Sequence, residues 1–189
     1  MSHHVIYIPG LGDSRSYGQN IALNLWRIFG LKPHYFALGW ADKQPFAAKL
    51  RRLLSEIDRL QNGGHKVSLV GVSAGASAAL NAYSRREDIA AVVLVVGKIQ
   101  NPQTIGERTY TINPAFKESM AMVKASLGQL DGRARKKIMS IHPLHDKTVP
   151  IADTVIPGAV EKTIPVRGHT FSIFYTVIFG SRFIAKFIK

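Results

Sequence analysis

The feature that most constrains this fold is a regular alternation of short apolar runs with segments of helical periodicity. The apolar runs are rich in β-branched residues, which is typical of strands. The segments between them place apolar residues three and four apart, which is typical of helices that cover a sheet. The expected strands are residues 5–8, 34–38, 67–70, 91–96, 138–141 and 160–166, and the expected helices are 21–29, 46–60, 74–83, 115–127 and 171–188.

This alternation predicts an α/β fold with about six mostly parallel strands, helices on both faces and right-handed crossovers. The length of 189 residues suits a single domain over residues 1–189, and no linker or internal repeat interrupts it. Residues 97–137 break the rhythm between two expected core strands. An insertion in that place is where a lid or substrate-shaping segment would lie.

The helix expected over 46–60 has a clear apolar stripe formed by Phe46 and several leucines. Lys49, Arg52, Glu56 and Arg59 are expected on the opposite, solvated face.

The chain carries 25 Lys and Arg against 12 Asp and Glu, for a net charge of +13. Such a charge attracts nucleic acid, anionic membrane or acidic substrates, although no basic cluster falls on a nucleic-acid motif. The absence of Cys excludes thiolate nucleophiles, disulfides and Cys-based metal sites. Residues 5–8 are too short for a secretory signal and 171–179 too short to span a bilayer, so we expect a cytoplasmic protein.

One motif carries chemistry. Gly71-Val72-Ser73-Ala74-Gly75 matches G-x-S-x-G, follows an expected strand and opens an Ala-rich helix. This strand–turn–helix context is that of a nucleophile elbow, in which a strained turn projects the serine hydroxyl above the sheet edge. The alternative is an ordinary glycine-bracketed turn whose serine caps the helix. The context favours the elbow.

At these residues the chain resembles the α/β-hydrolase superfamily, and small lipase-like or esterase-like serine hydrolases in particular. The resemblance runs from Val5 to the last helix and is weakest over 97–137. In that family the triad follows the order Ser, Asp or Glu, His. It implies Ser73 as nucleophile, Asp146 before Val149-Pro150 as the acid and His169 after Gly168 as the base.

The resemblance also implies an oxyanion hole made of two backbone N–H groups, from Ala74 and from Leu11 in Pro9-Gly10-Leu11-Gly12. Pro9 stands where the family often has His. This loop alone would equally suit a plain strand-ending turn. Trp40, Tyr17 and Phe171, like Leu11, could line an acyl pocket, although such residues are more often plain packing.

Three other features compete for roles. Asp153 is a rival acid, and we expect it instead to add charge to the first turn of a following helix. His142 and His145 have no further ligand nearby, so no metal site is expected. The last helix is expected to dock on the sheet, and its alternative use is contact with anionic membrane through its cations.

The sequence therefore predicts a serine hydrolase that cleaves a carboxylic ester or thioester through an acyl-enzyme. We expect a monomer that needs no cofactor, with a small-molecule ester or thioester as partner and no specific nucleic acid. An acyltransferase would use the same triad. The alternative from another class is a hydrolase-fold module with little catalysis that binds an anionic partner or membrane.

Overall fold

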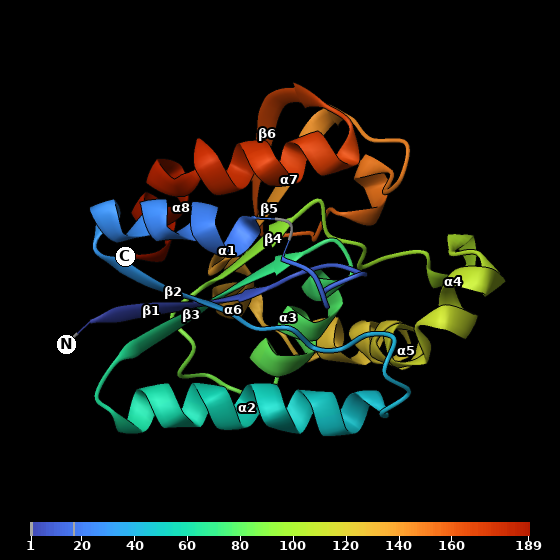
Figure 1. Cartoon of the computed structure of the whole chain (residues 1–189), viewed down its shortest axis with the longest axis horizontal. Coiled ribbons are helices and arrows are strands. Elements are labelled where there is room, and N and C mark those ends of the chain that lie inside the picture. Colours follow the sequence, from blue (N-terminus) through green and yellow to red (C-terminus); the bar gives the residue numbers. More distant parts are fainter. Residues whose placement is uncertain (1, 17) are drawn as a thin grey trace.

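Six strands form one fully parallel sheet in the order β2-β1-β3-β4-β5-β6 (Figure 1). The structure is a computed structural model that describes residues 2–16 and 18–189. The predicted α/β architecture is thus confirmed. The strands are β1 (His3–Ile8), β2 (Leu31–Tyr35), β3 (Lys66–Val72), β4 (Val92–Val95), β5 (Ile138–His145) and β6 (Val160–Arg167).

The second strand begins earlier than expected, at Leu31 rather than at residue 34. Pro33 lies within it and pairs in register with Val5 of β1. A proline is tolerated here because β2 is an edge strand, which needs ladder hydrogen bonds on one side only.

Helices cover both faces of the sheet (Figure 1). Successive strand residues alternate between the faces, so that Ile6 and Ile8 pack on one layer and Val5 and Tyr7 on the other. One layer consists of α2 (Phe46–Asn62), α3 (Gly75–Tyr83) and α5 (Pro114–Gly128). The other consists of α1 (Gln19–Ala22), the 3-10 helix η1 (Leu23–Phe29), α7 (His169–Ile178) and α8 (Ser181–Ile188).

Shorter elements connect these layers. They are η2 (Pro102–Thr104), α4 (Glu107–Ile112), α6 (Gly132–Lys136) and η3 (Ile151–Asp153).

The segment 97–137 differs from the expected lid. Its main helix, α5, buries Phe116, Met120 and Val123 against the sheet layer. Its Ser119 exchanges hydrogen bonds with α3, including one of 2.7 Å to Ser77. This helix belongs to the covering layer because its apolar face is already satisfied by the core.

The helix expected over 171–188 is two helices bent by 68°. The break falls at Gly180, where a Cβ would overlap the carbonyl oxygen of Thr176. The bend lets α8 turn a strongly amphipathic face inward and bury Ile184 and Ile188.

Lys49 also differs from its expected solvated position, because its side chain is fully buried in α2. Its ammonium group finds partners in the loop before that helix, as described below.

Candidate active site

The candidate site lies where neighbouring strands of the sheet send the chain in opposite directions. The chain leaves β1 toward β2 on one side, and leaves β3 toward β4 on the other. The loops that follow β1 and β3 therefore part at the carboxyl edge of the sheet. Such a switch point opens a crevice and is the usual ligand site in open α/β sheets.

Ser73 stands directly after β3, in the crevice, with a strained backbone. Its φ is +52°, in the left-handed region that non-glycine residues rarely adopt. The turn is so tight that a Cβ on Gly71 would lie 2.6 Å from the Gly75 carbonyl oxygen, and one on Gly75 would overlap the Ile8 carbonyl oxygen. The two glycines of the motif are thus a steric requirement of this turn.

Two further side chains meet Ser73, each from the end of a later strand. The Oγ of Ser73 lies 2.9 Å from Nε2 of His169, the first residue of α7 after β6. Nδ1 of the same ring lies 2.7 Å from Oδ2 of Asp146, which follows β5. The structure thus brings together the three side chains that the sequence places 73 and 23 residues apart along the chain.

The carboxylate of Asp146 is held from its other side. Its Oδ1 accepts hydrogen bonds from the backbone N–H groups of Thr148 (2.8 Å) and Val149 (3.0 Å). An ionised carboxylate only accepts, so Nδ1 of His169 carries the proton that it donates to Asp146. Nε2 is then free to accept the hydroxyl proton of Ser73. A further backbone bond from Gly168 to the carbonyl of His145 (2.8 Å) ties the two loops together.

The two predicted amide donors border the same hydroxyl. Ala74 follows Ser73, and Leu11 lies in the loop after β1. That loop approaches closely, since a Cβ on Gly10 would lie 3.0 Å from Cβ of Ser73. Within residues 2–16 and 18–189, neither amide donates to another backbone group. Both N–H groups are therefore available to a substrate oxygen.

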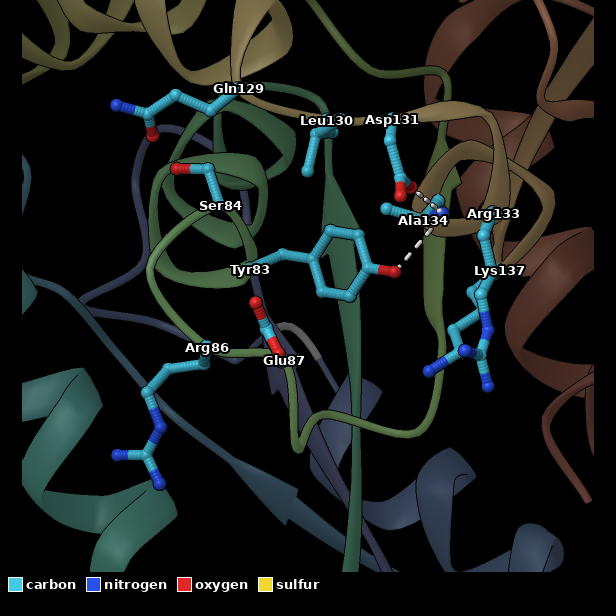
Figure 2. A pocket seen from close by; sticks show the side chains of 10 residues that line it. All are labelled: Tyr83, Ser84, Arg86, Glu87, Gln129, Leu130, Asp131, Arg133, Ala134 and Lys137. Carbon is cyan, nitrogen blue, oxygen red and sulfur yellow. Dashed lines mark hydrogen bonds between the residues drawn. The ribbon is translucent and has the colours of Figure 1, made fainter.

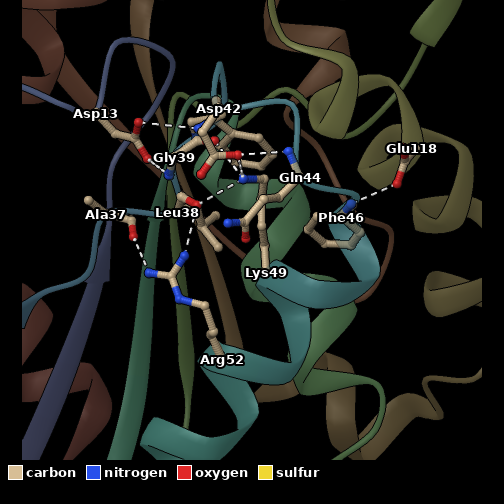
Figure 3. A network of polar contacts seen from close by, with 11 residues as sticks. Asp13, Ala37, Leu38, Gly39, Asp42, Gln44, Phe46, Lys49, Arg52 and Glu118 are labelled. Atoms are coloured by element: carbon tan, nitrogen blue, oxygen red, sulfur yellow. Dashed lines mark hydrogen bonds and ion pairs between the residues drawn. The ribbon is translucent and has the colours of Figure 1, made fainter.

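A buried polar network fixes the loop that carries Leu11 (Figure 3). Asp13 accepts hydrogen bonds from the backbone N–H groups of Gly39 (2.7 Å) and Trp40 (3.4 Å). The indole N–H of Trp40 in turn donates to the carbonyl of Pro9 (3.3 Å). The segment from Gly39 to Trp40 thus anchors both ends of the loop.

Lys49 of α2 binds the segment around Gly39 and Trp40 that anchors this loop. Its ammonium group donates to the carbonyl oxygens of Gly39 (2.6 Å) and Leu38 (3.3 Å) and pairs with Asp42. The hydrogen bond from Lys49 holds the pKa of Asp42 below its usual range. Arg52 adds a bond of 3.2 Å to the carbonyl of Ala37 (Figure 3). A lysine that looked solvated in sequence is therefore a structural support of the site.

A pocket of about 320 Å³ adjoins Ser73 and His169. Its walls combine aliphatic and polar side chains. Burial, followed by the neighbouring Asp13, raises the pKa of Tyr35 to about 12, so its hydroxyl stays protonated at neutral pH. The lining residues are Pro9, Gly10, Leu11, Gly12, Asp13, Arg15, Gln19, Tyr35, Val72, Ser73, Thr148, His169, Thr170 and Ile173.

Neither a protein-family model nor a curated relative matches the sequence. Solved structures do match. The pyrethroid hydrolase PytH is similar over 100% of this chain and 98% of its own, with a TM-score of 0.70 at 15% identity. Est1E from Butyrivibrio proteoclasticus is similar over 98% of this chain and 86% of its own, with a TM-score of 0.69 at 15% identity. An alpha/beta hydrolase superfamily protein from Enterococcus faecalis is similar over 100% of this chain and 90% of its own, with a TM-score of 0.61 at 15% identity.

The chain has the α/β-hydrolase fold. Four loops at the carboxyl edge of the sheet meet at one crevice. The loop after β1 contributes the backbone amide of Leu11, and the loops after β3, β5 and β6 contribute the side chains of Ser73, Asp146 and His169, respectively.

Two of the three aromatic residues predicted to line an acyl pocket lie elsewhere. Trp40 is fully buried in the core, 6.3 Å from the Phe46 ring and 5.7 Å from the Phe116 ring. Phe171 is 61% exposed and does not border the pocket. Both predictions were wrong because an aromatic residue near a motif in sequence can point to the core or to solvent. Tyr17 lies outside the described residues.

The sequence analysis missed Arg15, Gln19, Tyr35 and Thr148 as pocket residues, and no local pattern marks them. Asp13 had a signal, because it directly follows the Gly10-Leu11-Gly12 turn. Lys49 had one too, since it lies three residues after Phe46 and four before Leu53, on the stripe that α2 buries.

Asp153, the rival acid, lies in the first turn of η3, as expected, but its side chain is buried. It pairs with Lys98 and also accepts from Asn101, and the Lys98 and Asp153 side chains are 6% and 3% exposed. Its backbone carbonyl accepts from Ile99 and Gln100. Asp153 therefore joins the loop after β4 to η3.

Among the described residues, no group of three or more acidic or histidine side chains could hold a metal ion. His142 is buried with Nδ1 3.3 Å from its neighbour's carbonyl oxygen, and it has no second histidine as a partner.

Another pocket, of about 380 Å³, lies at the far end of α3 (Figure 2). Ser73 precedes α3 and Tyr83 ends it, which separates the two pockets by roughly 14 Å along the helix. Tyr83 donates to the carbonyl of Ala134 (2.9 Å), while Arg86 is paired with Asp58 and Asp88. Among the described residues that line this pocket, no nucleophilic side chain is hydrogen-bonded to a base.

Proposed function

We propose that this protein is a serine hydrolase that cleaves a carboxylic ester or thioester through an acyl-enzyme. The observation that carries the proposal is the continuous chain of hydrogen bonds from Ser73 Oγ through His169 to Asp146, at 2.9 and 2.7 Å. A serine hydroxyl is a weak nucleophile until an adjacent base accepts its proton. This geometry supplies that base and fixes its tautomer.

The reaction follows from the positions of these atoms. Ser73 Oγ attacks the carbonyl carbon of the substrate while Nε2 of His169 accepts the hydroxyl proton. The resulting imidazolium is stabilised by the carboxylate of Asp146. When the tetrahedral intermediate collapses, the bond to the alcohol or thiol breaks and His169 protonates that leaving group. A water molecule, deprotonated by His169, then hydrolyses the acyl-serine and restores the enzyme.

The negative charge on the carbonyl oxygen develops opposite the N–H groups of Leu11 and Ala74. Donors that are already oriented stabilise such an oxyanion without reorganisation, and one donor of this kind contributes roughly 10²–10³-fold in rate. The network of Asp13, Trp40 and Lys49 keeps the Leu11 loop in place.

The pocket favours small substrates. A volume of about 320 Å³ accommodates a short acyl chain together with a small leaving group. Leu11, Val72 and Ile173 would contact the apolar part of the substrate, while Arg15 and Thr148 offer hydrogen bonds to its polar part.

Hydrolysis of p-nitrophenyl esters of graded chain length tests this proposal. We expect acetate and butyrate to be turned over and longer chains to be slower. Ser73→Ala should reduce kcat by about a million-fold, the typical cost of removing the nucleophile of such a unit, whereas Ser55→Ala on the exposed face of α2 should leave it unchanged. Equal rates for the two variants would refute the proposal.

A further inference from the structure

One layer of the molecule combines exposed apolar side chains with an excess of positive charge. Residues 14–41 and 162–189, which form α1, η1, β2, most of β6, α7 and α8, contain eight Lys and Arg and no Asp or Glu. Most of the net charge of +13 therefore comes from this part of the chain. The opposite layer, with α2, α3 and α5, carries charges of both signs.

The exposed apolar residues form two helical stripes. Ile21, Leu25 and Ile28 follow one another at spacings of four and three on α1 and η1, with exposed fractions of 73%, 41% and 78%. Phe171 and Ile178 lie seven residues apart on α7, and Phe179 at its end is 68% exposed. Residues three, four and seven apart share one face of a helix.

The two stripes lie side by side because η1 and α7 pack together (Figure 1). The indole N–H of the buried Trp26 donates to the carbonyl of Val177 at 2.7 Å. Leu25 directly precedes Trp26 in the chain and Ile178 directly follows Val177, so this contact joins the two stripes. We use the name apolar–basic face for these exposed apolar residues and the cations beside them. The apolar residues are Ile21, Leu25, Ile28, Phe171, Ile178 and Phe179.

Those cations are Arg27, Arg182, Lys186 and Lys189, all of which are exposed. Arg27 lies between Leu25 and Ile28 in η1. The ammonium group of Lys189 reaches the end of η1, since a Cβ on Gly30 would lie 3.3 Å from it. Residues 14–41 and 162–189 thus bring cations but no Asp or Glu to this layer, and Glu161 near the start of β6 is the acidic residue next to the second range.

We infer that the apolar–basic face docks peripherally on an anionic lipid bilayer. Apolar side chains that enter the interface and cations that meet acidic headgroups are the two components of such binding. A second copy of the chain would bring like charges together on this face. A nucleic acid would use the cations and could stack on Phe171 and Phe179, but it would gain little from the aliphatic Ile21, Leu25 and Ile28, which a bilayer interface accepts.

The binding would be peripheral. No described helix alone is long and apolar enough to cross a membrane, and α7 and α8 satisfy such a test only together, across their 68° bend. The Ser73 pocket lies at one end of the face, because Gln19 of α1 and Thr170 of α7 line it. Docking would therefore bring the pocket close to the bilayer surface.

Co-sedimentation of the full chain with vesicles tests this inference without any measurement of activity, so its outcome is independent of the proposed hydrolysis. The vesicles are pure phosphatidylcholine or a 7:3 mixture with phosphatidylglycerol. We expect a partition coefficient at least tenfold higher on the anionic vesicles, and lower as salt rises.

Matched variants locate the surface. Ile21→Ser/Ile28→Ser/Phe179→Ser should lower the partition coefficient at least tenfold, whereas Ile112→Ser on α4, at a position 53% exposed, should not change it. Arg182→Gln/Lys186→Gln should also lower it at least tenfold, since one cation near such a surface contributes about fivefold. Arg51→Gln/Lys124→Gln, which removes the same charge from the opposite layer, should have a much smaller effect. Circular dichroism confirms that each variant is folded.

Three results would overturn the inference. The first is equal binding to both kinds of vesicle. The second is a dimer in light scattering that becomes monomeric in the Ile21→Ser/Ile28→Ser/Phe179→Ser variant, which would assign the face to a second copy. The third is binding of a single-stranded RNA oligonucleotide that this variant loses while vesicle binding persists.

Discussion

The carboxylate of Asp13 lies 2.7 Å from the backbone nitrogen of Gly39 and so joins the loop after β1 to the segment after β2. Both belong to the scaffold around the amide of Leu11. Asp13 is only 5% exposed, so its partners cannot turn to water when it is removed. This relationship makes Asp13 a positioning residue for the proposed oxyanion hole.

We expect Asp13→Ala to lower kcat on p-nitrophenyl acetate by about 10- to 100-fold, part of the 10²–10³-fold that one donor contributes. KM should change little, because Leu11 would contact the transition state more strongly than the bound ester. Asp13→Asn keeps an acceptor oxygen and should recover much of kcat. A purely structural role would instead lower the melting temperature of Asp13→Ala and leave the kcat of its folded fraction intact.

Asp146→Asn tests the acid. The amide oxygen can still accept from Thr148 and Val149, so the loop should fold. Its NH₂ group would face Nδ1 of His169 and favour the wrong tautomer, which should reduce kcat by about 10⁴-fold. Steady-state kinetics with circular dichroism as a folding control measures this. A loss smaller than tenfold would mean that another group orients His169.

The Lys98–Asp153 pair should matter for stability and not for chemistry. Lys98→Met leaves the Asp153 carboxylate buried without its cation, and we expect a loss of about 3–5 kcal/mol in the free energy of unfolding. Arg59→Ala removes an exposed pair with Glu56, where Arg59 is 62% exposed, and should change the free energy of unfolding far less, because solvent screens this pair. Urea unfolding of the two variants measures the difference. Equal losses in the free energy of unfolding would contradict the burial of the Lys98–Asp153 pair.

Three stacked histidines, His4 of β1, His34 of β2 and His65 just before β3, predict a pH dependence of stability. His4 lies between His34 and His65, with ring centroids 4.8 and 4.4 Å away. Burial, together with the positive charges around it, lowers the pKa of His4 to about 4, whereas an unfolded histidine titrates near 6.5. The unfolded chain therefore binds the proton first as the pH falls, and stability is lost between these two values.

The free energy of unfolding should therefore fall between pH 7 and pH 5, in part because of His4. His4→Phe keeps a stacked ring without a titrating group, so its free energy of unfolding should change less over the same range. Urea unfolding at the two pH values provides the measurement. An unchanged pH dependence in His4→Phe would remove His4 from the explanation.

Much of the fold could be predicted because each expected strand is a short apolar run that is separated from the next by a helical or turn-forming segment. Errors arose where local pattern and tertiary position disagree. The second strand was expected over 34–38 but spans 31–35, and its Pro33 is tolerated because β2 is at the edge. The apolar stretch after residue 171 suggested one helix, but Gly180 bends it so that α8 can bury its own apolar face.

The resemblance to the α/β-hydrolase superfamily implied Ser73, Asp146 and His169, and they can meet because each follows a parallel strand and the carboxyl ends of such strands share one edge. The pocket walls could not be predicted in this way. Trp40 turns to the core, while Arg15, Tyr35 and Thr148 approach from loops whose paths depend on tertiary contacts. Periodicity alone also could not show that Lys49 finds carbonyl partners inside.

Covalent labelling tests the central claim most directly. The chain is treated with a fluorophosphonate and its intact mass is measured, followed by peptide mapping. We predict one adduct per chain, on Ser73, present in Ser55→Ala and absent in Ser73→Ala. A folded chain that gains no adduct, or gains one elsewhere that survives Ser73→Ala, would contradict the assignment of Ser73 as an activated nucleophile.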